Sequence, residues 1–225
     1  MELDPLVLSL VKFFHVLLFV YWLGGDLGVW LTGKQMIRDD LSLDERLRIR
    51  GVGALIDMAP RTCLVLMIPA GFTLASVWGS PLQGAALAAV WVMCLAWLWL
   101  VWQVHWKKNE PIGKTLNSID LAIRYVVGAA ILAFGVYCLV TGGPVAEKWL
   151  AAKITLYGMI IYNGIVLRKI AGNWQGAFDK IRAGGEARAQ GELMMKANRR
   201  KVEPPVLTIW ALVAIMGFLG VVKPF

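Results

Sequence analysis

The stretch Val202–Phe225 reads "VEPPVLTIWALVAIMGFLGVVKPF" and is almost entirely apolar between positions 205 and 223. A run of about 20 apolar residues is the length that crosses a bilayer as a helix. Pro204 and Pro205 suit the first turn of such a helix, where the missing N–H groups cost least, and Pro224 suits its end. The stretch therefore predicts a transmembrane helix over 205–223.

Similar apolar runs occur five more times along the 225 residues, 58% of which are hydrophobic. The six predicted spans are 5–30, 60–78, 84–106, 119–141, 147–167 and 205–223. We therefore expect an all-α fold, a polytopic integral membrane bundle of about six transmembrane helices. A single bundle over 1–225 leaves no room for a soluble catalytic domain. The first run contains Lys12 and His15 and has no basic segment before it, so we expect a retained helix rather than a cleaved signal peptide.

Lysine and arginine are concentrated in three of the connecting segments. They number five in 31–60, three in 107–117 and nine in 168–203, whereas the opposite side has only Lys148 and Lys223. The positive-inside rule predicts that the three basic segments face the cytoplasm and that both termini are periplasmic, in a bacterial inner membrane. This topology explains the net charge of +8 without a nucleic-acid partner, and the basic segments would contact anionic membrane lipid.

Two polar segments carry local structural signals. Ser42 with Glu45 three residues later fits a capping box, which predicts a short cytoplasmic helix before the second span. The segment 171–203 predicts a cytoplasmic amphipathic region that Gly184 and Gly185 break into two short helices. Three cysteines fall inside predicted spans without forming a C-x-x-C pair, which argues against disulfide or thiolate-metal chemistry. These are Cys63, Cys94 and Cys138.

Ionisable residues inside a bilayer are costly and usually face a cavity or a partner. At about 1.5 Å per helical residue, Lys12, His15 and Lys153 fall within roughly 6 Å of one depth in the outer half, and Tyr157 lies one turn below Lys153. His105 falls on the order of 15 Å deeper than His15. Two axial nitrogens on one iron are only about 4 Å apart, so the two histidines are not expected to ligate the same metal.

His15 shares one helix face with Trp22 and Asp26, which follow it by 7 and 11 residues. Such a face is not expected to contact lipid. His15 is either a hydrogen-bonded structural residue or a metal ligand. Lys153 could pair with a carboxylate, lose its proton and act as a base, or ligate a metal. With Lys12 at the same depth, the two amines would suit the propionates of a haem b.

A second polar layer is predicted on the cytoplasmic side, where opposite charges would most simply pair across helices. It consists of Asp26, Arg61, Asp120, Arg124 and Glu203, with His105 at its edge.

Three stretches together resemble the HemJ-type protoporphyrinogen IX oxidase family, a small helical membrane fold related to CopD-like proteins. They are "HVLLFVYWLGG" (15–25), "WLAAKITLYGMIIYN" (149–163) and the final helix, which is entered through "RRKVEPP" and ends in "VVKPF" (199–225). A weaker match is "MAPRTCLVLMIPAG" (58–71). The matches cover a little over half of the chain. Because the family usually has four helices, 84–141 is predicted to be a two-helix insertion.

The resemblance implies a haem b held by His15, with Lys153 as the catalytic residue. The residues expected to bind the cofactor are Lys12, His15, Trp22, Tyr157, Arg199 and Glu203. The implied reaction oxidises a porphyrinogen-like tetrapyrrole substrate and passes its electrons to a quinone. Two alternatives stay open: a haem b electron-transfer subunit without a tetrapyrrole substrate, and a CopD-like transport or accessory protein without haem. A homo-oligomer or a partner membrane subunit would be compatible with each of these.

The sequence also departs from the family pattern at two places. The Arg-bearing motif that follows the first-helix glycine is replaced by "DLGVWLTG" (26–33), and Asn163 stands near a position where the family carries histidine. We therefore expect the fold and the haem site to be shared more readily than the substrate.

Overall fold

The computed structural model describes residues 4–225, and these contain helices but no strands. The first three residues of the predicted bundle lie outside the described part. The helices are α1 (Pro5–Met36), α2 (Leu43–Ile56), α3 (Met58–Ala75), the 3₁₀ turn η1 (Ser76–Trp78), α4 (Gly84–Trp106), α5 (Pro111–Thr141), α6 (Lys148–Gly172), α7 (Trp174–Ala183) and α8 (Gly185–Val222). The predicted all-α fold is confirmed.

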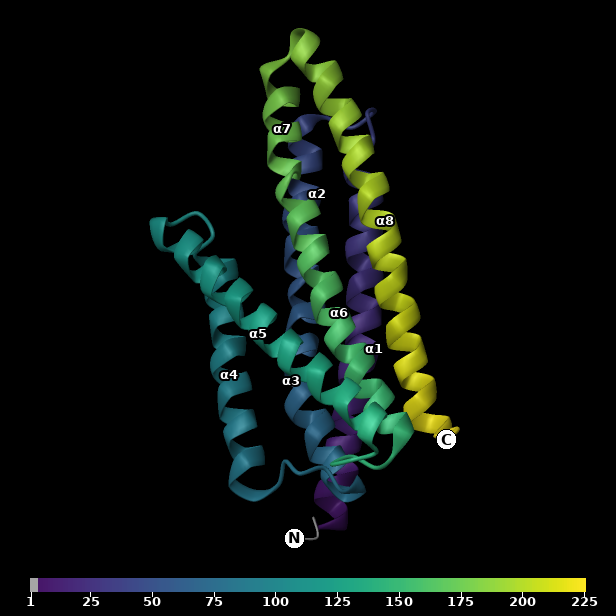
Figure 1. Cartoon of the computed structure of the whole chain (residues 1–225). Coiled ribbons are helices and arrows are strands. Elements are labelled where there is room, and N and C mark those ends of the chain that lie inside the picture. The colour runs from purple at the N-terminus through teal and green to yellow at the C-terminus, as the bar shows by residue number, and fades with distance from the viewer. Residues whose placement is uncertain (1–3) are drawn as a thin grey trace.

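Six helical segments of the described chain are long and apolar enough to cross a membrane. They are Pro5–Met36, Leu43–Trp78, Gly84–Trp106, Pro111–Thr141, Lys148–Ala183 and Gly185–Val222. The prediction of a multi-pass membrane bundle is therefore confirmed. Both chain ends lie at the same end of the bundle (Figure 1), as an even number of crossings requires. We call this the terminal end, and we call the opposite end, with α2 and the α7–α8 turn, the basic end.

The prediction that Pro204 and Pro205 begin the last helix is wrong. Helix α8 begins at Gly185, directly after the predicted break at Gly184, and runs through both prolines for 38 residues. The fixed φ of proline is compatible with a helix, and the cost is the loss of two N–H donors. The carbonyls that lose these donors belong to Arg200 and Lys201, which are exposed, so water can satisfy them.

A contact from α6 fixes α8 at this double proline. The side chain of Asn163 donates a hydrogen bond from Nδ2 to the carbonyl oxygen of Pro205, with a distance of 2.8 Å. Polar side chains on neighbouring helices commonly support a transmembrane helix where proline interrupts its hydrogen bonding. The residue that departs from the family pattern therefore has a structural partner in this chain.

The basic end has a small apolar core of its own. The capping box of Ser42 and Glu45 is present and begins α2, which confirms the predicted short helix before the second span. Helix α2 packs beside α7 (Figure 1), and side chains connect it to the first half of α8. The core residues are Met36, Trp174, Ala177, Phe178, Ile181 and Met195. The polar segment 171–203 is therefore a packed helical hairpin and not two separate surface helices.

Two ion pairs of different burial connect the helices of the basic end. The guanidinium of Arg46, which is 1% exposed, lies 2.8 Å from the carboxylate of Glu192 on α8. The amine of Lys196 lies 3.0 Å from Asp39 in the α1–α2 loop, and this hydrogen bond holds the pKa of Asp39 below its usual range. The buried pair requires both partners, since an unpaired buried charge is costly.

Helices α5 and α6 approach each other closely through glycine. Helix α5 begins at Pro111, eight residues before the predicted span, and crosses the bundle obliquely (Figure 1). A Cβ atom added to Gly158 of α6 would lie 2.8 Å from the Cα of Leu132, and one added to Gly135 of α5 would lie 2.5 Å from the backbone nitrogen of Thr155. Small residues at such crossings let membrane helices pack backbone against backbone.

We expect Gly158→Ala to destabilise the protein by about 1–3 kcal/mol, because the added methyl group meets backbone atoms that cannot move freely. Gly164→Ala in the same helix is the matched control. A Cβ atom added at Gly164 would have no neighbouring atom within 4 Å, and alanine favours helix formation. Thermal unfolding in detergent would compare the two variants. Equal midpoints would contradict the close α5–α6 packing.

Candidate functional site

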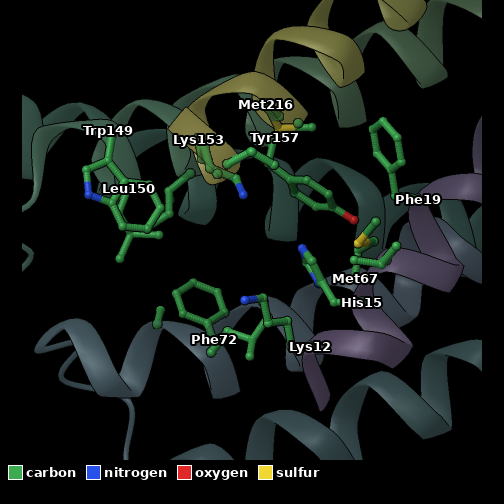
Figure 2. Close-up of a pocket in the computed structure, with 18 of the residues that line it drawn as sticks. Lys12, His15, Phe19, Met67, Phe72, Trp149, Leu150, Lys153, Tyr157 and Met216 are labelled. Atoms are coloured by element: carbon green, nitrogen blue, oxygen red, sulfur yellow. The ribbon is translucent and has the colours of Figure 1, made fainter. Parts of the chain in front are cut away.

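A cavity of about 830 Å³ lies among α1, α3, α6 and α8 in the terminal half of the bundle. Its walls are mainly apolar and aromatic, and Figure 2 shows several of the side chains that surround it. A volume of this size falls in the range of sites for small molecules and cofactors. The labelled wall residues besides the polar ones are Phe19, Met67, Phe72, Trp149, Leu150 and Met216.

Helical spacing brings the polar residues of the cavity to its interior. Lys12, His15 and Trp22 follow one face of α1, whereas Lys153 and Tyr157 are four residues apart on α6. Residues three, four and seven apart share a helix face. Figure 2 shows the amines of Lys12 and Lys153 and the imidazole of His15 pointing into the same space. The structure thus brings together five of the residues that the sequence singled out.

The imidazole of His15 lies in the cavity without a hydrogen-bond partner. Its Nδ1 atom is buried, and no described residue donates to it or accepts from it. Gly71 of α3 faces the ring, and a Cβ atom at that position would lie 3.6 Å from Cε1 of His15. A buried polar atom normally has a partner. The reading of His15 as a hydrogen-bonded structural residue therefore finds no support in the described contacts.

The charge of the cavity is entirely positive. Its described lining includes three lysines, Lys12, Lys153 and Lys223, and no aspartate or glutamate. Within residues 4–225, no carboxylate oxygen lies within 4.0 Å of any of these three amines. A Cβ atom at Gly220 would lie 2.6 Å from Nζ of Lys153, so this glycine leaves the space that the amine occupies.

Tyr157 and Trp22 form the deep end of the cavity. The Tyr157 hydroxyl donates a hydrogen bond to the carbonyl oxygen of Leu64 on α3. The rings of Trp22 and Tyr157 meet edge to face, with centroids 6.1 Å apart. The hydroxyl of Tyr157 is thus engaged with the backbone, and the aromatic ring forms part of the cavity wall.

Arg199 and Glu203, expected near the cofactor, do not line this cavity. Arg199 Nε lies 3.6 Å from Glu203 Oε1 on the same helix, and its guanidinium lies 3.6 Å from the ring centroid of Trp30. Val213 is the first residue of α8 that reaches the cavity, and ten helical residues span about 15 Å. Neither residue therefore reaches the cavity that His15 lines.

The second polar layer lies between the cavity and the basic end, and its ion pairs differ in part from those predicted. Asp120 is fully buried and lies 3.2 Å from Arg124 on its own helix and 2.6 Å from Arg168 on α6. It also accepts a hydrogen bond of 2.8 Å from the indole of Trp97 on α4. Arg61 pairs with Asp57, four residues earlier. Among the described ion pairs of this layer, only the one with Arg168 joins two helices, and Arg168 was not among the residues predicted for this layer.

His105 lies apart from His15. It packs against Trp102 on α4, with ring centroids 6.2 Å apart, and does not line the cavity. The two histidines therefore lie in different surroundings within the bundle.

Sequence reasoning missed the aromatic and basic residues at the mouth of the cavity. Trp78, Trp149 and Lys223 meet there. Trp149 could have been found, because it precedes Lys153 by four residues and shares its helix face. Lys223 was counted only among the few basic residues on the side opposite the cytoplasmic segments, since its position at the mouth depends on how α8 ends.

No protein-family model, no curated protein and no solved structure matches this chain.

We expect Asp120→Ala to lower the free energy of unfolding by about 3–5 kcal/mol, because it leaves two arginines in the bundle without their carboxylate. Asp57→Ala is the control, since that pair is about one-third exposed and exposed pairs contribute little. Thermal unfolding in detergent measures both. Similar losses in the two variants would argue against Asp120 as the centre of the layer.

Proposed function

We propose that the cavity binds haem b, with the imidazole of His15 as an axial ligand of the iron. The observation that carries the proposal is the buried, partnerless Nδ1 of His15 in a cavity that also holds uncompensated amines. A haem combines an iron that takes a nitrogen ligand, a flat apolar ring and two carboxylates. Imidazole, apolar walls and amines are the complementary groups.

The donor set also favours a porphyrin-bound iron over a bare metal ion. The described residues contain no group of three His, Cys, Asp or Glu that could hold a metal. An iron that is already held by four ring nitrogens needs only axial ligands, which a single histidine can begin to supply.

The chain's own residues suit an oxidation in this cavity. When bound, haem supplies one-electron redox chemistry. The amine of Lys153 projects into the same space without an acidic partner, so in its neutral form it is placed to accept a proton at Nζ from a reduced substrate. Lys12 is placed to pair with a carboxylate, and the apolar walls exclude water. The resemblance of the sequence to HemJ-type oxidases leads us to propose a porphyrinogen as the substrate and a membrane quinone as the electron acceptor.

The proposed orientation follows from the basic residues. The basic end would face the cytoplasm and the terminal end, with the mouth of the cavity, the periplasm of a bacterial inner membrane. A haem electron-transfer subunit would use the same His15 without a tetrapyrrole substrate, and activity distinguishes this alternative.

We expect the purified protein to show a Soret band, and His15→Ala to lose most of it, because the iron loses its axial nitrogen. His105→Ala is the matched control and should keep the band, since that ring does not line the cavity. The visible spectrum and the haem content per chain measure this. A colourless wild type, or a His15→Ala protein with full haem content, would contradict the proposal.

We expect the wild type to support growth of a bacterium that lacks its own protoporphyrinogen oxidase, and Lys153→Met to abolish this growth while haem is retained. Methionine preserves the length of the side chain but cannot take a proton. If the wild type binds haem yet fails to support growth, the electron-transfer alternative replaces the oxidase. If Lys153→Met remains fully active, Lys153 is not the base.

A further inference from the structure

Lys223 ends α8 at the mouth of the cavity in a backbone conformation that rarely suits a residue with a Cβ atom. Its φ and ψ are 49° and 61°, in the left-handed region. Among residues 4–225 it is the only residue other than glycine with positive φ. Glycine usually occupies this position at the end of a helix. A lysine held in a disfavoured conformation suggests that its side chain has a task.

The side chain of Lys223 turns back over two tryptophans at the mouth. Its amine lies 4.1 Å from the ring centroid of Trp78 in η1 and 5.3 Å from that of Trp149 at the start of α6. The two indoles meet edge to face, with ring centroids 5.6 Å apart. The amine therefore bridges the ends of three helical segments that border the cavity.

The interactions of this amine are of a kind that a ligand can replace. A cation over an aromatic ring is held weakly when the site is exposed, whereas a hydrogen bond between ammonium and carboxylate is among the stronger polar contacts. The nearby acidic residue, Glu147, accepts a hydrogen bond from Nε1 of Trp149 and forms no ion pair with Lys223. The charge of Lys223 is thus available to an incoming anion.

We propose that Lys223 recognises a carboxylate of the ligand at the mouth, by exchanging its contact with Trp78 and Trp149 for an ion pair. The cavity then selects amphiphilic carboxylic acids with a large apolar body and admits them from the terminal end. Lys12 and Lys153 also line the cavity, Lys12 at an exposed position and Lys153 half-buried. The choice of a tetrapyrrole acid as the test ligand rests on the proposed function, but recognition of the carboxylate does not require iron.

The probes are metal-free protoporphyrin IX and its dimethyl ester, which have the same ring but differ in their acidic groups. The full chain in lipid nanodiscs is titrated with each, and quenching of tryptophan fluorescence is measured against empty nanodiscs. We expect the wild type to prefer the diacid, and Lys223→Met to reduce that preference about tenfold. Lys148→Met removes the same charge at the same end of the bundle without touching the cavity and should leave the preference unchanged.

Two further variants guard against misfolding. Lys223→Gly removes the amine while favouring the left-handed conformation, so it should fold at least as well and show the same loss. Lys223→Arg keeps the charge and should keep the preference. The proposal is overturned if the wild type does not prefer the diacid, if Lys223→Gly retains the preference, or if Lys148→Met loses it equally.

His15→Ala separates this proposal from the haem proposal, because a ring without iron needs no axial ligand. That variant should keep its preference for the diacid while losing haem. A Lys223-dependent preference in a protein without a Soret band would refute the haem site alone. A Soret band that depends on His15, with no effect of Lys223 on acid preference, would refute only the proposal that Lys223 recognises a carboxylate at the mouth.

Discussion

One electrostatic feature underlies the rest of the structure: basic side chains line an apolar cavity without an acidic partner among the described residues. Lys12 and Lys153 project from different helices into a space whose lining includes no described carboxylate. Ionisable side chains at such depth are usually paired or serve a ligand. Among residues 4–225, the lining supplies an imidazole, on His15, but no carboxylate. A ligand that brings its own negative charges and a metal for the imidazole satisfies both needs at once.

The rest of the bundle holds these groups in place. On the side away from the mouth, Asp120 joins α4, α5 and α6 through Trp97, Arg124 and Arg168. Glycine contacts between α5 and α6 fix the helix that carries Lys153. Helix α5 therefore supports α6 directly, whereas α4 packs against α3 and α5.

Charge is segregated between the ends of the molecule in a way that follows the same logic. Acid–base pairs at the basic end, such as Arg46 of α2 with Glu192 of α8, connect different helices. At the terminal end Lys223 rests on two indoles instead of a carboxylate. Ion pairs thus connect helices at the basic end, whereas the amine of Lys223 at the terminal end is open to an incoming ligand.

Much of the architecture was predictable because it depends on local rules. Apolar run lengths predicted six membrane segments, the Ser42–Glu45 pair predicted the start of α2, and Gly184 predicted the break before α8. Rise per residue was enough to place His15 and Lys153 at one depth. The pairing of Asp120 with Arg168 and the continuation of α8 through Pro205 were not predictable in this way, since both depend on side chains from neighbouring helices. Lys223 was missed because its left-handed backbone turns the amine inward, and a linear depth count contains no such turn.

The most direct test of the account is an experimental density map of the protein purified from its membrane, by electron microscopy in nanodiscs. The account predicts flat, iron-centred density among α1, α3, α6 and α8, joined to the imidazole of His15 and flanked by the amines of Lys12 and Lys153. Acyl-chain density in that space, with Lys153 turned toward the lipid and His15 bonded to another side chain, would contradict it.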